Sequence, residues 1–234
     1  MSRFGEEVKK IVEVVGLSWA PIAGKFLVDN GGAGDSALKL SICEAFDVVK
    51  RGNVVLCLSK ETCVCPGGRH FAGLEIAPLE AFAPALTSKK HRVYESIDTA
   101  LESISKQPQP VKRGNFFKLG PLEKFESDPD LVFLFVNPAQ ADRVLGLISF
   151  KGAEPFMYYP ASSICSTITN VLAKGSPEIN LISTFERRAD KWSPNELILA
   201  MPLNDFKEAV ANIPNSGYGT FELQSGKPPS NSKS

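Results

Sequence analysis

The stretch Asp128-Pro-Asp-Leu131-Val-Phe-Leu-Phe-Val136-Asn-Pro-Ala-Gln140 contains the most continuous apolar run of the chain. Residues 131–136 are apolar at every position, so both faces of an extended segment would be apolar. Such a run predicts a strand in the middle of a sheet that is covered on both sides. Residues 141–150 follow as a predicted helix. Together with the other elements, this predicts the α/β class, with a mixed sheet and flanking helices.

Two polar side chains follow this strand closely. In open α/β sheets, ligands gather at the carboxyl ends of strands, so Asn137 and Gln140 are candidate ligand contacts. The same residue types also cap helices and form turns, which is their more common role. The remaining predicted elements are helices over residues 4–16, 91–105, 196–201 and 204–212 and a strand over 21–28.

The helix that starts near Ser41 has clear end signals. Ser41 and Glu44 match a capping box, and Gly52 supplies a left-handed stop. This places Cys43 in the first helical turn, where the helix dipole and the unpaired amides favour a thiolate. The pKa of Cys43 is therefore expected to fall if solvent reaches the thiol. A buried strand is predicted next, over residues 54–58.

The same order of features recurs later in the chain. Ser-Ile-Cys165 opens a second predicted helix, Gly175 ends it, and a strand follows over residues 179–183. The repeated order predicts two pseudo-repeated halves that share one core. The predicted organisation is a single domain over residues 1–225, with half one at about 8–80, a connector at 81–125 and half two at about 126–215, followed by a disordered tail at 226–234.

Composition narrows the function classes. The 234 residues include 26 basic and 26 acidic side chains, so no overall field attracts nucleic acid or an anionic membrane. The N-terminus lacks a signal-like apolar core, and no apolar run reaches the roughly 20 residues of a membrane span. We therefore expect a cytoplasmic protein. In that reducing compartment, the five cysteines are expected to be buried, metal-bound or reactive rather than paired in disulfides.

Three interpretations of the cysteines compete. In the first, Cys43, Cys63, Cys65 and Cys165 supply the four thiolates that a cubane iron–sulfur cluster or a structural zinc requires. The Cys63-Val-Cys65 spacing is tighter than the usual C-x-x-C. In the second, Cys43 or Cys165 is a reactive thiolate at its helix start. In the third, the cysteines are small buried side chains, which is the favoured interpretation for Cys57 in its predicted strand.

Further candidates surround the cysteine-rich loop. Arg69 or His70 could lower the pKa of a nearby thiol or move a proton, and the charged residues 186–188 could bind an anionic group from the second half. Motifs of ordinary hydrolases are absent from the sequence. The candidate ligand-binding residues are Gly67, Gly68, Arg69, His70, Asn137, Gln140 and Arg188.

The motifs described so far, with Cys65-Pro-Gly and Gly73-Leu74, together resemble the ArCR family, domain of unknown function 169, over about residues 8–210. That family has no settled activity, and its members come mostly from archaea and anaerobic bacteria. The resemblance implies that its recurring cysteines correspond to Cys43, Cys65 and Cys165. Many relatives carry a Gly-Cys-x-Gly-Cys-Arg segment where this chain has residues 183–188, without sulfur. Any site that uses that cysteine is altered here, with Cys63 or Cys57 as candidate substitutes.

These observations lead to one functional expectation and two alternatives. We expect a cysteine-lined metal centre, with an iron–sulfur cluster first and zinc or no metal as alternatives, in redox or cofactor-related metabolism of an anaerobe. The alternatives are a metal-free binding module for a small anionic ligand and a thiolate-dependent enzyme. A small molecule or an electron-transfer protein is the expected partner, nucleic acid and membranes are not, and homo-oligomer formation is left open.

Overall fold

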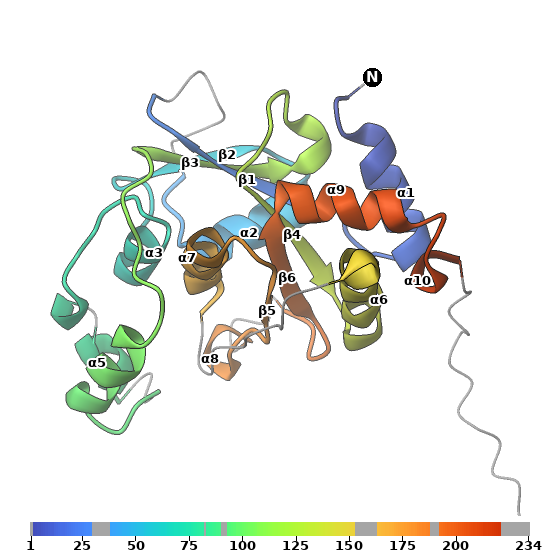
Figure 1. Ribbon diagram of the computed structural model, residues 1–234. Coiled ribbons are helices and arrows are strands. Elements are labelled where there is room, and N and C mark those ends of the chain that lie inside the picture. Colours follow the sequence, from blue (N-terminus) through green and yellow to red (C-terminus); the bar gives the residue numbers. More distant parts are fainter. Residues whose placement is uncertain are drawn as a thin grey trace, which may run out of the picture.

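Six strands form one antiparallel sheet in the described part of the computed structural model, in the order β2-β3-β1-β4-β6-β5 (Figure 1). The structure describes residues 2–29, 38–81, 83–89, 93–152, 163–187 and 192–220. The strands are β1 (Ile22–Leu27), β2 (Leu56–Ser59), β3 (Phe116–Pro121), β4 (Leu131–Val136), β5 (Glu178–Asn180) and β6 (Leu197–Pro202). The predicted α/β class with helices flanking a sheet is confirmed, and the sheet is antiparallel rather than mixed.

Helices cover both faces of the sheet. α1, α6 and α9 pack on one face, and α2, α3 and α7 pack on the other (Figure 1). No helix in the described ranges is long and apolar enough to cross a membrane. The helices are α1 (Gly5–Val15), α2 (Ile42–Gly52), α3 (Pro66–Phe71), α4 (Ala83–Thr87), α5 (Ile97–Ser105), α6 (Pro138–Ile148), α7 (Ile164–Lys174), α8 (Thr184–Arg187), α9 (Leu203–Asn212) and α10 (Gly217–Thr220), with short 3-10 turns η1 (Leu79–Ala81), η2 (Leu122–Lys124) and η3 (Ser149–Lys151).

Strand β4 occupies the predicted central position, between β1 and β6. Its alternate side chains enter two different cores. Leu131, Phe133 and Phe135 pack against α2 and α7, whereas the intervening valines and leucine pack against α1, α6 and α9. The ring of Phe133 meets that of Phe46 on α2 edge to face at 4.8 Å. Each fully buried apolar side chain of this size contributes about 1.5–3 kcal/mol, so β4 stabilises both layers.

The ends of α2 follow the sequence signals closely, with one correction. The Ser41 side chain accepts a hydrogen bond from the Glu44 amide, and the Glu44 carboxylate accepts one from the Ser41 amide, so the capping box is confirmed. The predicted stop at Gly52 is wrong by one residue. Gly52 is still helical, and Asn53 takes the left-handed conformation with φ 48°. Asparagine tolerates that conformation better than most residues with a side chain.

Two predicted helices differ from the structure. Residues 197–202 form strand β6, not the predicted helix over 196–201. Its leucine, alanine and methionine favour helices, but a short apolar run cannot be assigned by periodicity, and here it pairs along its whole length with β4. The helix predicted over 91–105 is described only as α5 from residue 97, because residues 90–92 lie outside the described residues. Residues 93–96 are not helical.

The sequence analysis missed strand β3 entirely, because it lies inside the segment 81–125 that was assigned as a connector. Gly120 and Pro121 at its end are unusual in a strand interior. The structure explains the glycine. A Cβ at position 120 would lie 2.8 Å from Cγ2 of Val55, so only glycine allows β3 to pass there. The segment predicted as a connector therefore contains strand β3, which lies between β2 and β1 in the sheet and pairs with both.

The strand order has an internal symmetry. Read from each edge, the sheet runs β2-β3-β1 and β5-β6-β4, so equivalent strands of the two proposed halves occupy equivalent positions. In each half, a helix that carries a cysteine in its first turn precedes the edge strand. A duplication would produce this order, and the duplication itself stays a prediction. The tail predicted at 226–234 lies outside the described residues.

Candidate functional site

Helices α2 and α7 lie on the same face of the sheet and contact each other. Each begins with a serine cap, an isoleucine and a cysteine, so Cys43 and Cys165 occupy the same position in their first turns. Cys65 caps the short helix α3, where its Sγ accepts a hydrogen bond from the amide of Gly68 at 3.3 Å. Because α3 also contacts α7, three helix starts bring cysteines to one region.

The thiols in this region influence one another. Burial raises the pKa of Cys43 well above its ordinary value, and the charge of Glu186 and the thiols of Cys165 and Cys65 raise it further. Burial likewise raises the pKa of Cys165, as do Cys65, Glu186 and Cys63. The pKa of Cys63 rises to about 11, chiefly through burial. The structure thus brings together Cys43, Cys63, Cys65 and Cys165, here named the cysteine cluster.

The raised pKa of Cys43 corrects one expectation. Its place in the first turn of α2 predicted a lowered pKa on condition that solvent reached the thiol. The thiol is partly buried instead, and it donates a hydrogen bond to Oε1 of Glu186 at 3.4 Å. Loss of solvation and a neighbouring negative charge both oppose ionisation, and together they outweigh the helix dipole.

All five cysteines are free thiols. Within the described residues, no group of three or more histidine, cysteine, aspartate and glutamate side chains is arranged so that it could hold a metal ion. Two further thiols of the cluster have polar neighbours. Cys63 donates to the carbonyl of Cys65 at 3.8 Å, and Sγ of Cys165 lies 3.0 Å from Oγ of Ser163. The donor set therefore suits a soft metal in kind and number, but not in its present arrangement.

Glu186 was predicted only as part of the charged run 186–188 that could bind an anion, and the structure places it at the cysteine-bearing helix starts instead. Its Oε1 accepts hydrogen bonds from the thiol of Cys43 and, at 2.9 Å, from the amide of Ile164 at the start of α7. Its Oε2 accepts from the amide and the hydroxyl of Ser183, which caps α8 in the manner of a capping box. The carboxylate thus joins α2, α7 and α8. The Ser183-x-x-Glu186 spacing was the available signal.

The backbone before α8 places Glu186 there. Ile182 has φ 53°, which is unusual for a β-branched residue, and its amide donates to the side chain of Asn180 at 2.7 Å. Backbone strain of this kind costs about 1–3 kcal/mol and persists where the surroundings hold it. The turn ends the edge strand β5, and the residues after it place Glu186 at the starts of α2 and α7. No residue type in this segment indicates a left-handed turn, so the predicted strand extended to residue 183.

The charge of Glu186 leads to a test of the site in metal-free protein. Glu186→Gln can keep the capping hydrogen bonds from Ser183 through its single oxygen, while it removes a negative charge beside Cys43, so the pKa of Cys43 falls and its thiolate fraction at a given pH rises. We expect alkylation of Cys43 by iodoacetamide at pH 8 to become several-fold faster, as followed by peptide mass spectrometry. Glu44→Gln, which alters the capping box of α2 in the same way, is the control. Equal rates in the two variants would contradict this electrostatic account.

The residues predicted around the cysteine loop have mixed roles. They form helix α3 rather than a loop. Gly68 is closely surrounded, because a Cβ there would lie 3.0 Å from Cγ1 of Ile42 and 3.4 Å from Sγ of Cys63. Gly67 has open space around it. The guanidinium of Arg69 forms an ion pair with the carboxylate of Glu75 at 3.1 Å, so its charge already has a partner within the protein.

His70 is buried, and its hydrogen bonds hold the backbone around α3. Its Nδ1 accepts a hydrogen bond from the amide of Ala77 at 3.2 Å. Burial lowers the pKa of His70, while a hydrogen bond with Gln109 acts in the opposite direction. A neutral imidazole at physiological pH follows, so His70 does not supply a positive charge to the cysteine cluster.

Asn137 and Gln140 are not brought together with the cysteine cluster. They form the capping box of α6, which packs on the opposite face of the sheet, and Nε2 of Gln140 donates to the carbonyl of Gly16. Cys57 is buried in β2, where burial raises its pKa, in keeping with a packing role. Arg188 lies outside the described residues.

Comparison with known proteins agrees with the sequence motifs. A family model described as uncharacterised ArCR, domain of unknown function 169, matches residues 10–212. No curated protein and no solved structure is significantly similar to the chain. The matched range contains the whole cysteine cluster, Glu186 and the six strands of the described sheet. The chain therefore belongs to the uncharacterised ArCR family, domain of unknown function 169.

Proposed function

We propose that the cysteine cluster binds a metal centre through thiolate ligands, and that this centre is an iron–sulfur cluster. One observation supports the proposal: four free thiols from three segments of the chain lie in one region, beside the starts of α2, α3 and α7. Cubane clusters and structural zinc sites both take four cysteine thiolates. A bound iron–sulfur cluster would supply one-electron transfer, which suits redox or cofactor-related metabolism in an anaerobe.

The surroundings of the thiols support a buried centre. Cys63 and Cys165 belong to the apolar core that α2, α3 and α7 form with the sheet. Metal binding requires deprotonated thiols, so the centre would displace their protons and the hydrogen bonds that they now make to Glu186 and Cys65. The sulfur atoms would also have to turn toward one point, because the described residues do not hold them in a metal-binding arrangement. The apolar shell would limit solvent access to the centre.

The two alternatives have less support from the geometry. A thiolate-dependent enzyme needs a lowered pKa, whereas burial and Glu186 raise the pKa of Cys43. A small anionic ligand at the helix starts would compete with an internal anion, because the carboxylate of Glu186 already accepts from the amide of Ile164. A metal centre must also displace the thiol protons, but a bound metal ion deprotonates the thiols that coordinate it, so the raised pKa values oppose it less than they oppose a free thiolate.

The test is the metal content of protein purified without oxygen. We expect one centre per chain, with iron and acid-labile sulfide in equal amounts and a brown colour that bleaches on reduction or in air. Stoichiometric zinc in colourless protein would support the zinc alternative. Protein that contains neither metal, and takes up neither after reconstitution with iron and sulfide or with zinc, would overturn the proposal.

A further inference from the structure

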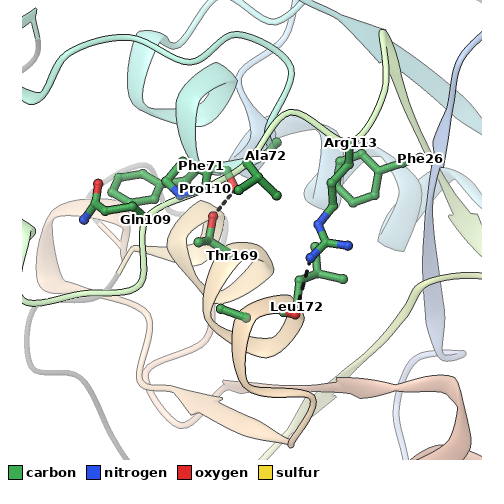
Figure 2. A pocket seen from close by; sticks show the side chains of 10 residues that line it. Phe26, Phe71, Ala72, Gln109, Pro110, Arg113, Thr169 and Leu172 are labelled. Carbon is green, nitrogen blue, oxygen red and sulfur yellow. Dashed lines mark hydrogen bonds between the residues drawn. The ribbon is translucent and has the colours of Figure 1, made fainter.

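A cavity of about 220 Å³ lies between α3, α7 and the segment 109–113, and none of its lining residues is a cysteine. Figure 2 shows side chains from distant parts of the sequence around it, with Phe26 from β1, Phe71 from α3 and Leu172 from α7. The hydroxyl of Thr169 donates to the carbonyl of Phe71 and joins the two helices beside the cavity. The walls are therefore mostly apolar and are held by both helices.

One cationic side chain lines this cavity. The guanidinium of Arg113 points to α7, where it donates to the carbonyl of Leu172 at 3.4 Å (Figure 2). That hydrogen bond is long, and it uses only one of the five N–H donors that a guanidinium has. Among the described residues, Arg113 forms no ion pair with a carboxylate. An exposed guanidinium that pairs with no carboxylate of the described residues, beside aromatic and aliphatic walls, suits a ligand that has an acidic group and an apolar body.

The volume limits the size of that ligand. Binding sites for drug-sized molecules measure about 300–1,000 Å³, so this cavity accepts a smaller molecule. A single ring or a short branched chain with one carboxylate matches both the volume and the charge. We propose that the cavity binds a small organic carboxylate, and that Arg113 recognises the carboxylate group while Phe26, Phe71 and Leu172 contact the apolar part.

The place of the cavity on α7 relates it to the cysteine cluster. Thr169 and Leu172 lie four and seven residues after Cys165, on the same side of the helix. At 1.5 Å per residue, Leu172 is about 10 Å from Cys165 along the helix axis. A carboxylate in the cavity would therefore be a near neighbour of any centre at the cluster. The inference itself needs no metal, because only residues of the cavity carry it.

The test uses the full chain and benzoate as the probe. We expect benzoate to bind with a millimolar or tighter dissociation constant and to shift the amide signals of Ala72, Thr169 and Ala173 in ¹H–¹⁵N spectra. Benzamide, which has the same shape without the charge, and inorganic phosphate, which lacks the apolar body, should both bind at least tenfold more weakly. Equal binding of benzoate and benzamide, or shifts only at other residues, would overturn the inference.

Substitutions distinguish a specific role of Arg113 in binding from a general effect of positive charge at this surface. Arg113→Gln should weaken benzoate binding at least tenfold, whereas Lys112→Gln, which removes a neighbouring exposed cation, should leave it unchanged. Ala173→Leu fills the cavity from an exposed helix position and should also weaken binding. Circular dichroism confirms that each variant is folded. If benzoate binds Arg113→Gln as tightly as it binds the unaltered protein, the assignment of Arg113 is wrong, whatever metal the cysteine cluster holds.

Discussion

Lys50→Met is expected to lower the free energy of unfolding by about 3–5 kcal/mol, because it leaves a nearly buried carboxylate without its cation. Nζ of Lys50 lies 3.0 and 3.1 Å from the two carboxylate oxygens of Glu196, and the two side chains are only 2% and 10% exposed. Methionine keeps the length and the packing of the lysine stem. The measured loss would therefore report the charge rather than a cavity. Urea unfolding at neutral pH gives the value.

The surroundings of Lys50 make this interaction stronger than a surface ion pair. Its ammonium lies over the rings of Trp192 at 4.4 Å and Phe135 at 4.8 Å, where cation–π attraction adds to the ion pair. Trp192 and Phe135 are themselves stacked at 5.5 Å. The cage links the end of α2 to the residues that follow α8, so loss of the cation affects both halves of the fold.

Two comparisons sharpen this prediction. Arg51→Met removes the next cation on the same helix, whose pair with Asp47 is much more exposed, and it should cost far less. Lys50→Met combined with Glu196→Met replaces the whole pair with apolar side chains and should recover most of the lost stability. If Lys50→Met destabilised the protein no more than Arg51→Met, the buried pair would not stabilise the fold as argued.

The second large effect concerns metal binding. Cys43→Ala and Cys165→Ala should each reduce the metal content of anaerobically purified protein from one centre per chain to nearly none, because each removes a proposed ligand. Cys57→Ala is the matched control. Cys57 is also a buried free thiol, but it lies in β2, and no thiol of the cysteine cluster affects its pKa. Iron, sulfide and zinc analysis measures the difference. Equal metal contents in Cys43→Ala and Cys57→Ala would remove Cys43 from the site.

The elements that the sequence predicted best have strong local signals. The capping box of Ser41 and Glu44 starts α2, and Gly175 ends α7 with φ 67°. Residues 131–136 form a strand with the predicted bounds, since an apolar run of this length between turn signals fits only a buried position. In each case, a few neighbouring residues are enough to determine the local structure.

The elements that were missed depend on distant partners. β6 resembles a helix in composition and becomes a strand because β4 and β5 lie on either side of it. Strand β3 was not predicted because it contains Gly120, which is unusual in a strand. A glycine is needed at this position because the side chain of Val55, from another part of the chain, lies too close for a Cβ. Local propensity carries no information on such neighbours. The antiparallel direction of the whole sheet has the same origin.

For the site, the repeated Ser-Ile-Cys pattern was informative because it placed two cysteines at equivalent helix starts. The meeting of Cys43 and Cys165 then follows from α2 and α7 packing side by side on one face of the sheet. The contact of Glu186 with Cys43 was not predicted, since the position of Glu186 depends on the left-handed turn at Ile182. Asn137 and Gln140 form a cap, which is their more common role, and a ligand contact at these residues stays a prediction, because a cap and a ligand contact look alike in sequence.

The most direct test of a metal centre in the cysteine cluster is a crystal structure of the anaerobically purified protein with anomalous difference maps at the iron and zinc edges. The proposed site predicts a peak between the sulfur atoms of the cysteine cluster, Cys43, Cys63, Cys65 and Cys165, with each sulfur at bonding distance from the metal. Metal-loaded protein with its peak elsewhere, and with these sulfur atoms still in their present hydrogen-bonded positions, would contradict it.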